Sequence, residues 1–332
     1  GMRLIGCRGN SDNAANTALT PIAEYYGVMI GQDPRTNELQ GPTDMFRAYS
    51  AQRRDRAPLI ETEDFRDEAA RRFWDDYSPP HFGFKQGPKD TYNWNSETFC
   101  LADAIRYNAY WTNRISNPDP ANSKWSGYAS IYFSDPNADG RQDSSEVARV
   151  SGKVDGVRLP KEIYFTQQVM QNTQPQVHII GHWTYPANTT KNIYVVANTA
   201  SVELFLNGKS LGKADHPVDL SFDRDSKPIL NTGKPTGFIF AFPKVTFVPG
   251  TLRAVGYDKA GRQVADYQLT TAGPAVALRL TPHTSPKGLL ADGADVAFFD
   301  IEAVDAKGER CPTDEARVDF KLTGPAIWRG GY

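Results

Sequence analysis

Three carboxylates, Glu61, Glu63 and Asp64, follow directly on a short apolar run at 58–60. A run of this length bounded by charged residues is typical of a buried strand, and a charged segment with helical spacing precedes it at 43–56. In α/β barrels the chemistry lies at the C-terminal ends of the strands. The pattern therefore indicates acid chemistry at a strand end, although a strand that simply re-enters solvent also ends in charged residues.

The stretch from Pro58 to Asp64 resembles the nucleophile strand of glycoside hydrolase family 2, which includes β-galactosidases and β-glucuronidases. In that family the glutamate stands five positions after the proline, and Glu63 occupies this position here. The resemblance implies a retaining glycosidase. In such enzymes one carboxylate attacks the anomeric carbon, and a second, about 5–5.5 Å away, protonates the leaving oxygen. Glu63 would be the nucleophile.

Two other glutamates compete with Glu63 for the role of nucleophile. Glu97 has a Ser-Glu-Thr context that also occurs around nucleophiles of the family, but its position equally favours a capping acid in the first turn of a helix. Glu61 lies two residues before Glu63, on the same face of an ideal strand, and is typical of an ion-pair partner. Glu63 is the favoured choice.

The acid/base glutamate of the family follows an asparagine at the end of an earlier strand. The pair Asn37-Glu38 lies in a proline-flanked loop, too close to Glu63 for this role. The resemblance therefore implies an acid/base residue upstream of Met2 and a chain that is a fragment of a longer glycosidase. The activity of the fragment is then in doubt, and the localisation stays unknown; a periplasmic or extracellular location would suit the full-length protein.

Aromatic and amide side chains could bind a sugar near these acids. Aromatic rings offer stacking faces, although packing in the core or at the rim is equally typical of them. The candidates for substrate binding are Tyr77, Trp94, Asn95 and Trp125.

A second pattern, at 135–146, has the spacing of a calcium-binding loop, with oxygen ligands at positions 1, 3, 5, 9 and 12 and Gly140 at position 6. The candidate ligands are Asp135, Asn137, Asp139, Asp143 and Glu146. The alternative is a polar loop whose acids pair with nearby arginines, since a strand precedes the loop. We expect that no cofactor is required and keep calcium as an option. His178 and His182 have no evident third metal ligand, which favours hydrogen bonds between domains.

The elements that must position these residues change along the chain. Up to residue 80, predicted strands at 2–8, 27–31 and 58–62 alternate with predicted helices at 12–25, 43–54 and from 68 onward. Such alternation favours parallel strands. A further strand is predicted at 127–135, with helices at 98–114 and 162–172. Because a barrel needs eight strands, the resemblance implies that residues 1–175 are the C-terminal part of a (β/α)8 catalytic barrel.

From residue 177 the apolar period becomes two, which predicts an antiparallel β-sandwich at 176–273. Asn207-Gly208 between two short strands is a strong hairpin signal. The stretch 202–212 resembles the sandwich that follows the barrel in family 2. Residues 274–332 resemble the immunoglobulin-like module of these enzymes but are too few for a complete domain of about 100 residues.

Composition narrows the function classes. The chain has 37 basic and 39 acidic residues, a net charge of −2 and no basic stripe, which argues against nucleic acid as a partner. No apolar run approaches the length of a membrane span, so no membrane partner is expected. The resemblance to glycoside hydrolase family 2 implies a retaining β-glycosidase, of β-galactosidase type, acting on an oligosaccharide or glycan, with a homo-oligomer as an option. The alternative is a non-catalytic carbohydrate-binding or structural fragment.

Overall fold

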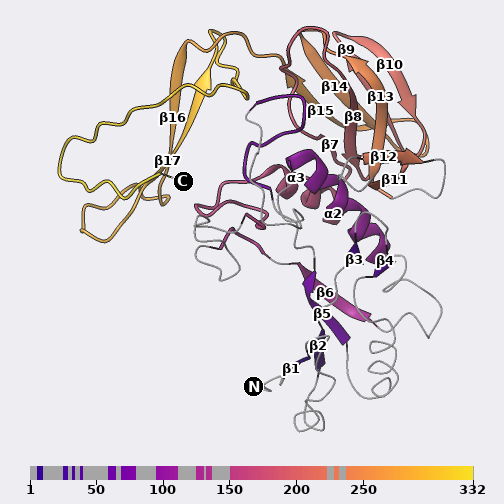
Figure 1. The fold of residues 1–332 in the computed structure, drawn as a ribbon, viewed down its shortest axis with the longest axis horizontal. Coiled ribbons are helices and arrows are strands. Elements are labelled where there is room, and N and C mark those ends of the chain that lie inside the picture. The colour runs from indigo at the N-terminus through magenta and orange to yellow at the C-terminus, as the bar shows by residue number, and fades with distance from the viewer. Residues whose placement is uncertain are drawn as a thin grey trace, which may run out of the picture.

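The computed structural model describes twelve stretches of the chain: residues 6–9, 25–28, 32–33, 38–39, 59–64, 69–79, 95–110, 125–130, 132–136, 150–222, 228–231 and 237–331. For the strands before residue 131, the description concerns the backbone and its pairing. Strands predominate, and two helices separate the N-terminal sheet from the later sheets (Figure 1). Within these stretches, no helix is long and apolar enough to span a membrane.

The N-terminal sheet is parallel. Its strands are β1 (Gly6–Gly9), β2 (Tyr25–Val28), β5 (Leu59–Asp64) and β6 (Trp125–Ser130), in the order β1-β2-β5-β6. β3 (Gln32–Asp33) and β4 (Glu38–Leu39) form a separate short antiparallel pair. The expectation that the stretches 58–63 and 128–134 are parallel strands of one sheet is confirmed, since β5 pairs in parallel with β6. The strand predicted at 127–135 is too long, because β6 ends at Ser130 and residues 132–135 belong to no strand; Ser134 forms only an isolated bridge to Val154. The predicted helix at 43–54 lies outside the described residues, as does the one at 12–25 up to residue 24.

Helices α2 (Ser96–Tyr110) and α3 (Glu162–Gln171) were both expected from the sequence. α2 begins two residues earlier than predicted, and residues 111–114 of the predicted helix lie outside the described residues. All residues of α2 from Ser96 to Ile105 are buried. A helix that is buried all round belongs to the interior of a larger assembly of elements. α2 indeed packs in one apolar cluster with α3 and with side chains of the sandwich such as Tyr194 and Ile239.

The helix predicted from residue 68 is wrong over the residues that the structure describes. Residues 69–79 form a turn and an extended loop, and Arg72 takes a left-handed backbone conformation with φ of 71°. This conformation interrupts a right-handed helix. The physical reason lies in long-range contacts, because the side chains of Arg71 and Arg72 pair with acids 84 to 228 residues away, Asp155 and Asp300.

The described residues within 176–273 form an antiparallel β-sandwich, which we call the sandwich. One sheet has the order β13-β8-β7, with β13 (Ile239–Thr246), β8 (Thr190–Ala197) and β7 (Val177–Ile179). The other has the order β10-β9-β14-β15, with β10 (Lys209–Ala214), β9 (Ser201–Leu206), β14 (Thr251–Tyr257) and β15 (Gln263–Thr270). β11 (Asp219–Phe222) pairs with β12 (Pro228–Asn231).

The local chemistry of the sandwich follows the sequence closely. Asn207 and Gly208 have φ of 51° and 78° in the turn between β9 and β10, as the predicted hairpin requires. Side chains alternate between the two faces of β8. Ile193, Val195 and Ala197 pack inside the sandwich. Their neighbours there include Trp183, Leu204 and Phe240. Tyr194 and Val196, on the opposite face of β8, pack on the helices. β8 is therefore buried on both faces.

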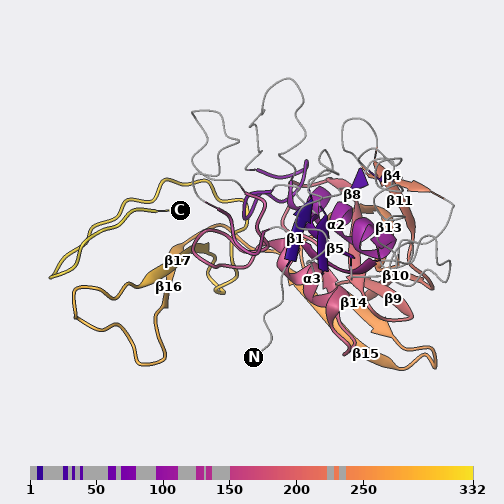
Figure 2. The same ribbon diagram turned by 90° about the horizontal axis from the view of Figure 1, so that it is seen from below.

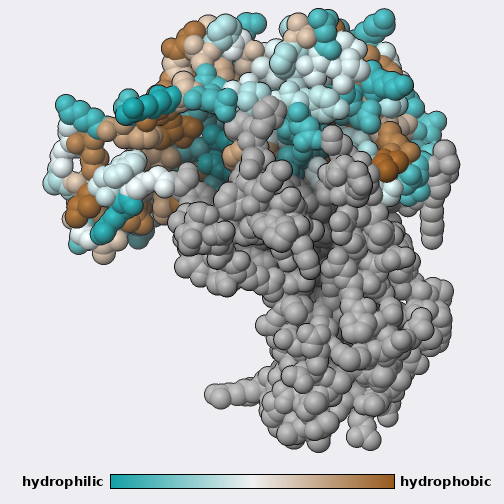
Figure 3. Space-filling model, viewed as in Figure 1, coloured by the Kyte–Doolittle hydropathy of each residue, from teal (hydrophilic) through white to brown (hydrophobic). Residues whose placement is uncertain are grey.

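Residues 274–331 contain the antiparallel pair β16 (Ala277–His283) and β17 (Phe298–Val304), and we call them the C-terminal module. This pair projects away from the sandwich in both ribbon views (Figures 1 and 2). Apolar side chains gather on the surface of the C-terminal module, as the brown region of Figure 3 shows. The exposed large apolar side chains of this module include Leu278, Leu280, Phe298, Phe299 and Trp328. Surface of this kind is typical of a face that packs against another element.

Candidate functional site

The candidate nucleophile lies at the end of a parallel strand. Glu63 is the last residue but one of β5, and β5 and β6 end at the same edge of the sheet. Glu61 is paired with Tyr128 and Asp64 with Ser130, so two residues of β5 stand opposite the single residue 129 of β6. Such an irregularity is a bulge, a feature enriched next to active sites because it re-aims a side chain.

The predicted substrate-binding residues are spread over several places. Trp125 is the first residue of β6 and pairs with Leu59, so it lies at the opposite end of the strand pair from Glu63. Trp94 lies outside the described residues. Asn95 precedes α2 and accepts a hydrogen bond from the Thr98 N–H at 2.8 Å, which makes it the cap of the helix. Tyr77 is 45% exposed, with the ammonium of Lys191 5.5 Å from its ring centre.

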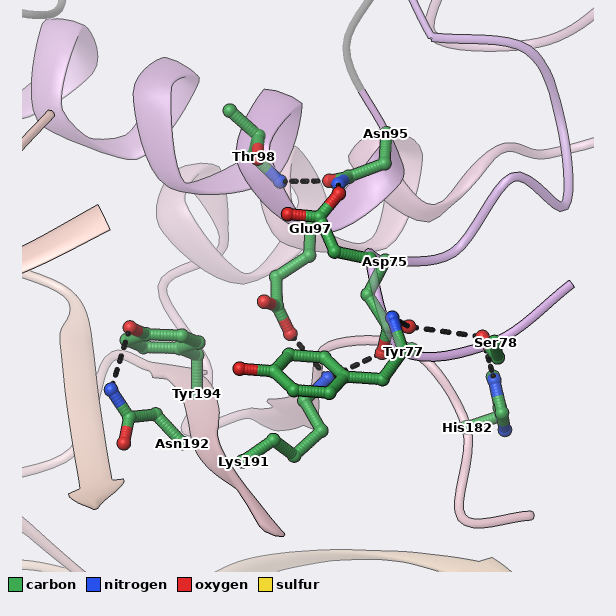
Figure 4. A network of polar contacts seen from close by, with 12 residues as sticks. Asp75, Tyr77, Ser78, Asn95, Glu97, Thr98, His182, Lys191, Asn192 and Tyr194 are labelled. Atoms are coloured by element: carbon green, nitrogen blue, oxygen red, sulfur yellow. Dashed lines mark hydrogen bonds and ion pairs between the residues drawn. The ribbon is translucent and has the colours of Figure 1, made fainter. Parts of the chain in front are cut away.

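Glu97, the rival nucleophile, occupies the first turn of α2, as its alternative interpretation predicted. It is buried and belongs to a group of four side chains, Asp75, Glu97, Tyr185 and Lys191, which we call the Lys191 cluster (Figure 4). The Lys191 ammonium lies 2.5 Å from Asp75 Oδ2 and 2.7 Å from Glu97 Oε2. The Tyr185 hydroxyl donates to Asp75 Oδ2 at 2.6 Å. Glu97 thus holds a buried ammonium between the helix and the sandwich.

The cluster contains two acids and one lysine. The pKa values of the two acids therefore differ, because a single ammonium cannot neutralise both carboxylates. Burial alone would raise the pKa of Asp75, but attraction to Lys191 and hydrogen bonds from Lys191 and Tyr185 outweigh it and lower the pKa to about 2. Burial raises the pKa of Glu97 to about 7, and the neighbouring charge of Asp75 adds to the effect of burial against the attraction of Lys191. When two carboxylates share one site, the second ionises with difficulty.

A relay of hydrogen bonds connects the cluster to a neutral histidine. The Thr184 N–H donates to Nδ1 of His182 at 3.0 Å, so this nitrogen is an acceptor and Nε2 carries the proton. Nε2 then donates to the Ser78 hydroxyl at 2.9 Å, and that hydroxyl donates to Asp75 Oδ1 at 2.9 Å. Burial lowers the pKa of His182 to about 3, so the ring stays neutral. The sequence analysis expected hydrogen bonds between domains for His182, and the bond from His182, at the start of the sandwich, to Ser78 confirms this expectation.

His178, the other histidine of this region, contacts a glutamate at the start of α3. Its Nε2 lies 2.6 Å from Glu162 Oε1, which also accepts the Gly181 N–H at 2.8 Å. β7 is thereby tied to the start of α3. In the part of the chain that the structure describes, no group of three His, Cys, Asp or Glu side chains could hold a metal ion.

Of the five predicted calcium ligands, only Asp135 is described; residues 137–149 are not. Asp135 is buried, and its Oδ1 accepts from the Lys161 ammonium at 2.6 Å and from the Gly152 N–H at 2.8 Å. Burial lowers the pKa of Lys161 to about 8 against the attraction of Asp135. The alternative interpretation, a paired acid, therefore describes Asp135, although its partner is a lysine rather than an arginine.

Sequence reasoning missed Lys191 and Lys161 as buried cations. The apolar alternation in the sequence marks this strand only from Ile193 onward, whereas β8 begins at Thr190. Lys191 lies two residues before Ile193 and four before Val195, both of which are core residues. A lysine at that period in a strand predicts a buried, paired ammonium, so extending the strand would have found it.

Comparisons with known proteins assign these modules. Residues 188–265, within the sandwich, match a domain of unknown function, DUF4982, and residues 278–331 match glycoside hydrolase family 2 C-terminal domain 5. A β-glucuronidase of Formosa agariphila is 42% identical over 278 residues, which are 83% of this chain and 26% of the relative. A β-galactosidase of Bacteroides ovatus is 30% identical over 180 residues, 54% of this chain and 19% of the relative.

Solved structures agree with these relatives. A β-glucuronidase from glycoside hydrolase family 2 superposes with a TM-score of 0.69 at 38% identity, over 83% of this chain and 26% of that chain. A family 2 member from Bacteroides cellulosilyticus, at 18% identity and a TM-score of 0.58, shares the fold over 93% of this chain and 33% of that chain. The chain thus spans about a quarter of its curated β-glucuronidase relative, at 26%. With its C-terminal domain and these relatives, the chain belongs to glycoside hydrolase family 2.

Proposed function

We propose that this chain is part of a retaining β-glycosidase in which Glu63 is the nucleophile. The observation that carries the proposal is the bulge at the C-terminal end of β5, in a parallel sheet, at the position where the family motif places its glutamate. The identity of 42% to a β-glucuronidase over 83% of the chain supports the same function.

The proposed reaction has two steps. The Glu63 carboxylate attacks the anomeric carbon and forms a covalent glycosyl-enzyme, while a second carboxylic acid protonates the leaving oxygen. The second group then acts as a base on the water that releases the sugar. We place this acid/base residue, and the remaining strands of a (β/α)8 barrel, outside these 332 residues. Residues 1–175 would supply the C-terminal part of that barrel, followed by the sandwich and the C-terminal module.

The proposed substrate is a β-linked glucuronide. The sequence alone favoured a β-galactosidase type, but the β-glucuronidase relative has the higher identity, 42% against 30%, and covers more of the chain, 83% against 54%. Glucuronic acid differs from galactose in the configuration at C4 and in its C6 carboxylate, which a site recognises through cations or hydrogen-bond donors. Discrimination of this kind reaches large ratios because an unpaired polar group in the site is costly.

The direct test is turnover by the full-length protein that contains these residues. We expect hydrolysis of an aryl β-glucuronide with retention of the anomeric configuration, and little hydrolysis of the matching aryl β-galactoside. Faster hydrolysis of the galactoside would restore the β-galactosidase type. Binding of a glycan without turnover of either substrate would favour the non-catalytic alternative.

A further inference from the structure

We propose that Asp300 and Lys191 are positioning residues, which hold segment 69–79 from two different modules and thereby fix the loop that leaves the nucleophile strand. The inference rests on the proposed function, because it assigns a role to residues far from the reacting atoms. Neither residue is expected to touch the substrate. Both act through the backbone that follows Glu63.

Segment 69–79 is close to the nucleophile along the chain. Its first residue follows Asp64, the end of β5, by five positions, and five residues span at most about 18 Å when fully extended. The segment is fixed at this first residue. The Ala69 N–H donates to Val150 O at 3.1 Å, and Ala69 O accepts from the buried Lys161 ammonium at 2.9 Å. Because only a few residues separate the segment from β5, a displacement of the segment would be transmitted to the end of β5.

The C-terminal module contacts the middle of the segment through hydrogen bonds and an ion pair. The Arg72 guanidinium donates to both carboxylate oxygens of Asp300 at 3.0 Å, although the two residues lie 228 positions apart. The Trp74 indole N–H donates to Pro312 O at 2.9 Å, and the Arg310 guanidinium lies 5.0 Å from the Trp74 ring centre. A charge-assisted contact of this kind fixes geometry as well as contributing energy.

The backbone at this point supports a role in positioning. Arg72 holds a φ of 71°, a conformation that costs free energy for a residue with a side chain. Such a conformation persists only where the surroundings over-determine it. The contacts to Asp300 supply that constraint from the C-terminal module, and Arg71 adds a second contact to Asp300 at 3.5 Å.

The sandwich contacts the C-terminal part of the segment, at Asp75 and Ser78. Asp75 is held by the ammonium of Lys191 and the hydroxyl of Tyr185, and Ser78 receives the hydrogen bond from His182. Figure 4 shows Asp75 and Glu97 converging on Lys191 from the segment and from α2. Lys191 therefore connects β8 with segment 69–79 and with the first turn of α2. Reacting groups must be held within about 1 Å of their productive geometry, so a loop fixed from two sides serves catalysis.

The first experiment compares two matched variants of the full-length enzyme, Asp300→Asn and Asp319→Asn. Both remove one negative charge of the C-terminal module that pairs with an arginine. Asp300 pairs with Arg72 of segment 69–79, whereas Asp319 pairs with Arg317 of its own module on the exposed surface, at 2.8 Å. We expect Asp300→Asn to lower kcat at least about tenfold per active site titrated with a mechanism-based inhibitor, with a smaller change in KM. Hydrogen exchange in segment 69–79 should quicken about tenfold. Asp319→Asn should change neither quantity.

The second experiment addresses the sandwich. Lys191→Met is made together with Glu97→Gln, so that a single buried acid, Asp75, keeps its hydrogen bonds from Tyr185 and Ser78. Lys213→Met, at a half-exposed lysine of β10, is the control. The paired substitution should again lower kcat per titrated site and quicken exchange in 69–79, and the control should do neither.

The outcomes separate this inference from the proposed function. A lower yield of titrated sites with unchanged kcat per site would mean that Asp300 and Lys191 only stabilise the fold, and it would overturn the inference. Unchanged exchange in 69–79 would overturn it as well. If the unmodified enzyme turns over no aryl glycoside, the proposed function fails, while the exchange measurements still show whether the two modules hold the segment.

Discussion

Lys191 and Asp75 lie 116 residues apart in the chain, and their side chains meet at 2.5 Å in a buried space between the sandwich and segment 69–79. The same ammonium contacts Glu97 at the start of α2. Because one cation faces two acids, Asp75 stays ionised and Glu97 is the group that carries a proton near neutral pH. We therefore expect the docking of the sandwich on segment 69–79 and α2 to depend on pH.

The pH dependence of stability should change in Glu97→Gln. The pKa of Glu97 is raised from 4.5 to about 7 in the folded protein, so the folded state binds more protons between these values. The stability from this group is full below pH 4.5 and is lost as the pH rises through 7, by up to about 3 kcal/mol. Glutamine imitates the protonated acid and should remove this fall.

Urea unfolding at pH 5, 6, 7 and 8 measures the effect. The free energies of unfolding of the two proteins should diverge as the pH rises, with the wild type falling more steeply. Asp75 does not interfere, since its lowered pKa gives a stability that is lost only as the pH falls through 3.8 towards 2. Parallel curves for the wild type and Glu97→Gln would show that Glu97 does not titrate in this window.

Gly152→Ala should destabilise the connection between Asp135 and Lys161. A Cβ at this position would lie 2.3 Å from the Asp135 backbone nitrogen and 2.4 Å from the Ser134 carbonyl carbon, so backbone would have to move. We expect a loss of about 1–3 kcal/mol, measured by urea unfolding. Gly331→Ala, where a Cβ meets nothing within 4 Å, is the control and should stay within about 0.5 kcal/mol. Equal values for both would contradict the packing at Gly152.

Local features were predictable from the sequence, and contacts between distant residues were not. The Asn207-Gly208 hairpin and α3 depend on turn chemistry and helical spacing within a few residues, and both formed as expected. The helix predicted from residue 68 failed because Arg71 and Arg72 serve partners far along the chain. No local pattern encodes such a partner.

The candidate site divides in the same way. The parallel pairing of the nucleophile strand followed from alternating strands and helices, and the first-turn position of Glu97 from its place before an apolar run. The bulge beside Glu63 depends on the register with β6, more than 60 residues later, and could not be read from β5 alone. The Lys191 cluster was hidden because its members come from segment 69–79, from α2, and from β8 and the loop before it.

Metal removal should leave turnover unchanged. Two carboxylates suffice for retaining glycoside hydrolysis, and the Asp135 Oδ1 atom already accepts the Lys161 ammonium at 2.6 Å. Dialysis of the full-length enzyme against a chelator should change neither kcat nor Tm, and added Ca²⁺ should not raise Tm. A loss of activity that Ca²⁺ alone restores would revive the calcium site at 135–146.

The 332 residues produced alone should show negligible glycosidase activity. We have proposed that the acid/base residue lies outside them. The absence of a general acid typically lowers the rate of hydrolysis by about 10²–10⁴-fold. Initial rates on an aryl β-glucuronide measure this directly, with the full-length enzyme as the reference. Turnover by these residues alone at the rate of the full-length enzyme would show that they contain their own acid/base group.

Covalent labelling of the full-length enzyme tests the assignment of the nucleophile most directly. A fluorinated β-glucuronide inhibitor traps the glycosyl-enzyme, and peptide mass spectrometry identifies the residue that carries the sugar. We predict that Glu63 is labelled in the wild type, and that Glu63→Gln folds normally but loses both labelling and turnover. A label on Glu97, on Glu61 or on a residue outside β5 would contradict the account.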